Sequence, residues 1–70
     1  MMTLLLYFSE CEHNGDQAHY AEDIAACGGQ HIEKLPTDRR DGVCAIRCEV
    51  PDKKGFMRAF AQTDSYAFLE

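Results

Sequence analysis

The sequence predicts an α+β domain in which two helices cover one face of a four-stranded antiparallel sheet. Short apolar segments alternate with helical patterns in the order strand–helix–strand–strand–helix–strand. The chain has 70 residues, of which 46% are hydrophobic, so it can form one small core but not two. Proline and glycine are too few for a disordered chain. We therefore expect a single domain over residues 1–70.

The first half of the chain contains the first strand, the first helix and a weaker second strand. Thr3–Ser9 is short and apolar and predicts a buried strand, followed by a polar loop over Glu10–Gly15. A capping-box pattern of Asn14 and Gln17 and the helix-ending pair Gly28-Gly29 predict a helix over 15–27. His31–Leu35, which ends at Pro36, predicts an edge strand.

The second half repeats this alternation. A charged turn over Thr37–Gly42 leads into Val43–Val50, where apolar and polar residues alternate as in a strand. Asp52 is a suitable N-cap for a second helix, whose buried side is expected to be Phe56, Met57 and Phe60. Ser65–Leu69 predicts the last strand.

This order of elements is that of a ferredoxin-like βαββαβ sandwich, with the first and third strands in the centre of the sheet. The third strand is expected to place Cys44, Ile46 and Cys48 in the core and the alternate residues on the open face. We expect that core to include the residues Leu4, Leu6, Ile24 and Phe60. The alternate residues are Val43, Ala45, Arg47 and Glu49.

Charge is distributed unevenly along the chain. The net charge is −5, yet residues 1–33 carry no lysine or arginine and a charge of −6, whereas residues 34–70 carry +1. An acidic half-chain repels phosphate, so direct nucleic-acid binding is not expected. No membrane partner is expected either, because no stretch approaches the ~20 apolar residues of a membrane span. Such a half-chain suits a basic protein surface, although an acidic face that only keeps the protein soluble is the alternative. The candidate partner-binding residues are Glu10, Glu12, Asp16, Glu22, Asp23 and Glu33.

These features predict a non-enzymatic interaction protein that binds a basic, nucleic-acid-binding surface of a larger partner, such as a nucleoprotein complex, and blocks it. In size and charge the chain is similar to phage- or mobile-element-encoded inhibitors, including anti-CRISPR proteins. Nothing in the sequence resembles a nucleotide loop or a Ser-His-Asp arrangement, so no catalytic residue and no cofactor is expected.

The four cysteines are expected to be reduced thiols in a cytoplasmic protein. The only apolar N-terminal segment, Leu4–Phe8, has no basic residue before it and is too short for a signal peptide or a membrane span. Cys44 and Cys48 are expected to be inert in the core, and Cys11 is expected to be a reactive loop thiol.

Cys11 and His13 form the alternative candidate site, because thiolate and imidazole both bind zinc or copper. In length and strand order the chain resembles heavy-metal-associated domains, which carry their metal on a Cys-x-x-Cys pair in the corresponding loop. That resemblance implies a soluble metal-binding module that uses Cys11 and His13, although the second cysteine of the pair is missing here.

The open face of the sheet is a further candidate contact surface. Leu5 and Tyr7 of the first strand are expected there, with Arg47 of the third strand and Tyr66 of the last. This face is apolar enough to form a homodimer or another protein contact.

Overall fold

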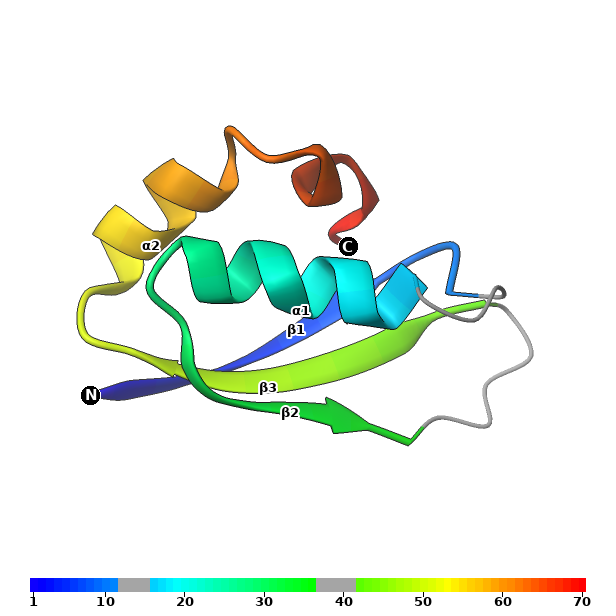
Figure 1. The fold of residues 1–70 in the computed structure, drawn as a ribbon, viewed down its shortest axis with the longest axis horizontal. Helices are drawn as coiled ribbons and strands as arrows, with labels where there is room; N and C mark the ends of the chain where they lie inside the picture. Colours follow the sequence, from blue (N-terminus) through cyan, green and yellow to red (C-terminus); the bar gives the residue numbers. More distant parts are fainter. Residues whose placement is uncertain (12–15, 37–41) are drawn as a thin grey trace.

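A computed structural model describes residues 1–11, 16–36 and 42–70 of the chain. Over these residues the elements are β1 (Met2–Phe8), α1 (Asp16–Ala26), β2 (Gln30–Leu35), β3 (Cys44–Val50), α2 (Lys53–Phe60) and the 3-10 helix η1 (Asp64–Phe68). The strands form an antiparallel sheet in the order β1-β3-β2, and the helices lie on one side of it (Figure 1). The α+β class is confirmed, and strand β3 lies in the centre as predicted. The prediction that the first strand is also central is wrong, because β1 lies at an edge of the sheet.

The prediction of a fourth strand is wrong. Residues 64–68 form η1, and only Leu69 pairs with β1, in an isolated bridge to Phe8. The 3-10 turns satisfy the backbone locally, as in the 3.1 Å hydrogen bond from Leu69 N–H to the Tyr66 carbonyl. They also turn Ser65, which is fully buried, toward α1, where its hydroxyl donates to Asp23. These contacts with the helix layer replace the strand pairing that the sequence predicted.

The buried side of the sheet follows the predicted alternation. Leu4 pairs with Cys48 and Leu6 with Ile46, and all four side chains are buried. They pack in one cluster with Ile24 of α1 and with Phe56 and Phe60 of α2, which confirms the predicted core. Val43 is the exception, because it was expected on the open face and is buried. It precedes the first residue of β3, so the alternation of the strand does not determine its direction.

The ends of the helices are partly as predicted. Helix α2 has Asp52 as its N-cap, and the carboxylate accepts a 3.2 Å hydrogen bond from Gly55 N–H. Helix α1 ends before Gly28, which has a φ of 98°, a conformation that glycine adopts without steric cost.

The capping-box prediction for Gln17 is not confirmed. The Gln17 side chain donates hydrogen bonds to the carbonyls of Leu35 (3.2 Å) and Ala45 (2.9 Å), so it ties α1 to the adjacent ends of β2 and β3. Asn14 lies outside the described residues, as do 37–41 of the charged turn.

Candidate functional site

The acidic residues of the first half occupy different surfaces. Glu10 is exposed at the end of β1, and Glu22 is exposed on α1. Glu33 lies on the open face of the sheet, where it forms an ion pair with Arg47 of β3. Glu12 lies outside the described residues, and Asp16 is the first residue of α1. The structure therefore leaves Glu10 and Glu22 as the exposed candidates without a basic partner among the described residues.

Asp23 has a structural role. Its carboxylate accepts a hydrogen bond from the buried hydroxyl of Ser65 in η1 and lies 3.5 Å from Nε2 of His19, one turn earlier on α1. The Asp23 side chain is 23% exposed. Because a buried hydroxyl would lose its partner without this carboxylate, Asp23 holds η1 against α1.

A shallow groove of about 380 Å³ runs between α1 and β2. Its apolar lining comes from small residues of α1 and from Ile32, and Glu22 and Lys34 add opposite charges to the lining. The lining contains no serine, cysteine or histidine that could act as a nucleophile or base. The groove can accept an apolar side chain flanked by charge. Its full lining is Ala18, Ala21, Glu22, Ala25, Ile32 and Lys34.

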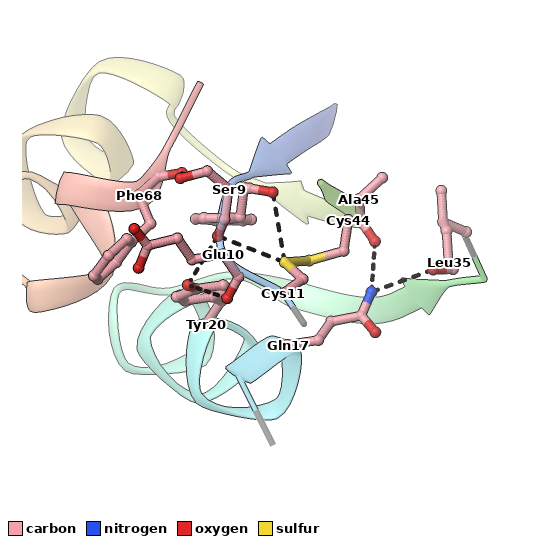
Figure 2. Close-up of a disulfide and its surroundings, with 10 residues drawn as sticks. Ser9, Glu10, Cys11, Gln17, Tyr20, Leu35, Cys44, Ala45 and Phe68 are labelled. Atoms are coloured by element: carbon pink, nitrogen blue, oxygen red, sulfur yellow. Dashed lines mark hydrogen bonds between the residues drawn. A yellow bond between two sulfur atoms is a disulfide. The ribbon is translucent and has the colours of Figure 1, made fainter. Parts of the chain in front are cut away.

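A disulfide joins Cys11 to Cys44, with a Cα–Cα distance of 5.8 Å (Figure 2). It connects the segment after β1 to the first residue of β3, and Cys11 N–H also donates a 2.7 Å hydrogen bond to the Gly42 carbonyl. The prediction that all four cysteines are reduced is therefore wrong for this pair. In this state Cys11 has no thiolate to offer a metal, which removes the sulfur ligand of the alternative site.

The described residues contain no group of three or more metal-ligating side chains, and His13 lies outside them. They also contain no helix that is long and apolar enough to cross a membrane.

Tyr20 of α1 supports the segment that contains the disulfide. Its ring stacks on Phe8 with a centroid distance of 4.5 Å, and its hydroxyl donates a 3.1 Å hydrogen bond to the Ser9 carbonyl (Figure 2). Ser9 N–H in turn donates to the Phe68 carbonyl at 2.8 Å. The end of β1, the start of β3, α1 and η1 therefore meet at this position. Sequence reasoning did not identify Tyr20.

The two free cysteines are Cys27 and Cys48. Burial raises the pKa of the Cys48 thiol above its ordinary value of 9.0. Burial also raises the pKa of the Cys27 thiol, and the nearby carboxylate of Asp23 adds to that effect. Both thiols are therefore poor nucleophiles at neutral pH. The expected burial of Cys48 is confirmed, since its side chain is fully buried.

The open face of the sheet carries Leu5, Tyr7 and Arg47, as predicted. Leu5 is 47% exposed and pairs with Arg47 across the strands, and Tyr7 is 40% exposed. Tyr66 does not join this face, because it lies in η1, where its ring meets the edge of Phe60 at a centroid distance of 6.4 Å.

Comparisons with protein-family models, with curated proteins and with solved structures gave no match to this chain.

Proposed function

We propose that this protein is a small, non-enzymatic interaction protein that binds a basic surface of a larger partner. The partner surface is one that otherwise binds nucleic acid, and occupying it blocks that binding. This is the mode of action of phage- or mobile-element-encoded inhibitors such as anti-CRISPR proteins.

The observation that carries the proposal is the charge of α1. The helix carries Asp16, Glu22 and Asp23 and no lysine or arginine. Even its last turn has none, although a basic residue there would stabilise the helix through its dipole. Among the described residues, Glu33 is the one acid paired with a lysine or arginine. The exposed acids on and before α1 are therefore free to attract a cationic surface.

The opposite charge is concentrated elsewhere in the molecule. Helix α2 carries Lys53, Lys54 and Arg58, all exposed, and contains no acidic residue. Because α1 is acidic and α2 is basic, the electrostatic field of the molecule is uneven. This field would orient α1 toward a basic partner during the encounter. The apolar groove beside Glu22 would then receive a side chain of the partner.

A cytoplasmic site of action is part of this proposal, because the nucleic-acid-binding surfaces that it addresses lie inside cells. Disulfides are rare in that compartment, so the Cys11–Cys44 bond is subject to reduction there. The proposal therefore requires that the reduced domain remain folded.

The test begins with affinity capture of the partner from host cells, followed by association kinetics of the purified pair. Glu22→Lys should slow association by about tenfold at low salt and should reduce its salt dependence, since both effects come from long-range attraction. Glu10→Lys should act in the same direction. Asp23→Lys is not suitable, because it would remove the partner of buried Ser65.

The matched control is Glu49→Lys, which makes the same change of charge on the open face of the sheet, away from α1. It should leave association within about twofold of the wild type. Equal association rates for Glu22→Lys, Glu49→Lys and the wild type would show that α1 is not the binding surface. A captured partner whose nucleic-acid binding is unaffected would refute the blocking mechanism.

A further inference from the structure

The outer edge of β1 is mostly unpaired. In the bridge between Phe8 and Leu69, the Tyr7 carbonyl accepts a 2.9 Å hydrogen bond from Glu70 N–H, and Ser9 N–H donates to the Phe68 carbonyl. Tyr7 and Ser9 therefore direct their backbone groups away from β3. Because this direction alternates along a strand, Thr3 and Leu5 direct their N–H and C=O groups outward as well. No other described segment donates to these groups of Thr3 and Leu5 or accepts from them.

This edge is open because the predicted fourth strand is absent. In the four-stranded arrangement, Ser65–Leu69 would have run along β1. In the structure that segment coils into η1 and reaches β1 only at Leu69.

The other edge of the sheet, formed by β2, carries the features that discourage strand addition. Strand β2 has a register shift between Gln30 and Glu33, and His31 within it has a φ of 51°. It also carries the charged residue Lys34, and Pro36 follows its end. Bulges, lysine and proline are the features that prevent edge-to-edge pairing. Strand β1 has none of them.

The side chains of β1 are apolar and exposed. Residues 1–9 contain no Asp, Glu, Lys or Arg, although the chain as a whole has a charge of −5. Four of the five large hydrophobic residues that are exposed in the described structure lie in this segment, namely Met1, Met2, Leu5 and Tyr7. An exposed, uncharged and regular edge of this kind is a template for strand addition.

We propose that the β1 edge binds a second copy of this chain, with the two β1 strands antiparallel across a two-fold axis. A second copy fits because its β1 offers the same unpaired groups and no charged side chain that would repel the first. In the register centred on Leu4, Thr3 of each copy exchanges backbone hydrogen bonds with Leu5 of the other. Tyr7 N–H then meets the Met1 carbonyl of the second copy.

Two features limit the assembly to a dimer. Leu69 and Glu70 occupy the Tyr7 carbonyl and Ser9 N–H, so the added strand can pair with β1 only as far as Tyr7 N–H, which limits the register. The β2 edges at the two ends of the combined sheet are protected, so no third copy can add. This inference concerns the sheet edge and does not depend on the proposed function of α1.

Sedimentation equilibrium over a range of concentrations tests the proposal. The mass of the wild type should rise from the 7.9 kDa of one chain to that of two and then stop. Leu5→Pro removes an outward N–H and should weaken dimerisation by about tenfold or more. Leu5→Lys keeps the backbone but places a charge beside the axis on each copy, and it should weaken dimerisation similarly while the exposed position preserves the fold.

The matched control is Lys34→Pro, which removes an outward N–H from the β2 edge. It should leave dimerisation unchanged. A wild type that remains monomeric up to millimolar concentration would overturn the proposal, and so would full dimerisation of Leu5→Lys. In a mixed sample of labelled and unlabelled chains, a contact between the two Leu4 residues should appear in nuclear Overhauser spectra. A dimer without that contact would refute the pairing.

Discussion

Cys11 and Cys44 are far apart in sequence, and their bond closes a long loop. Their separation is 33 residues, for which the loop-entropy relation gives a stabilisation of roughly 4 kcal/mol. Small domains have total stabilities of about 5–15 kcal/mol, so we expect the reduced domain to be weakened but still folded. Urea unfolding of Cys11→Ala/Cys44→Ala, followed by circular dichroism, should show a loss of about 3–4 kcal/mol.

Cys27→Ser is the control for that experiment, because Cys27 is a free and only partly buried thiol. It should lose less than about 1 kcal/mol. If reducing agent alone unfolds the wild type, the protein cannot act in a reducing compartment, and the cytoplasmic part of the proposed function is wrong.

The Cys48 thiol makes the free energy of unfolding depend on pH in the alkaline range. Because burial raises its pKa in the folded state, the unfolded chain loses the thiol proton first. The contribution to stability is therefore complete below the ordinary pKa of 9.0 and is lost as the pH rises through the higher folded pKa. Unfolding free energies measured across this range should fall more steeply for the wild type than for Cys48→Ala. Parallel curves for the two proteins would contradict the burial of this thiol.

At the scale of the element, β3 determines the core. Ile46 is fully buried, whereas its neighbour Arg47 is exposed and paired with Glu33. Ile46→Asp would bury an unpaired carboxylate, at a cost of several kcal/mol, and should unfold the domain. Arg47→Gln removes only an exposed ion pair and should cost less than about 1 kcal/mol. Thermal unfolding of both variants provides the comparison, and a folded Ile46→Asp domain would show that the strand register is wrong.

The elements with clear periodicity could be predicted from the sequence. The three strands and the first helix begin and end within a few residues of the predicted limits, and the second helix begins just after its predicted N-cap. Their apolar residues repeat with period two or with helical spacing, which is why the sequence predicts them. The prediction of a strand over Ser65–Leu69 is wrong because five residues are too few to distinguish a strand from a 3-10 turn. Its contacts decide the outcome, and the partner of Ser65 is Asp23, 42 residues away.

At the scale of the whole molecule, the surface charge could be predicted only in part, and the disulfide was not predicted. The absence of basic residues before Lys34 is visible in the sequence, but the pairing of Glu33 with Arg47 depends on the register of β2 and β3. The same holds for the disulfide, since Cys44 comes within reach of Cys11 because it pairs with Phe8 at the end of β1. Such pairings follow from strand register and not from local pattern.

The most direct test of this architecture is amide hydrogen exchange along β1 in a dilute, monomeric sample. The sheet ends at β1, so the amides of Leu4, Leu6 and Phe8, which face β3, should exchange slowly. The amides of Thr3 and Leu5, which face outward, should exchange rapidly. Slow exchange of Thr3 and Leu5 in the monomer would mean that a fourth strand covers this edge, and it would contradict both the three-stranded sheet and the open edge inferred from it.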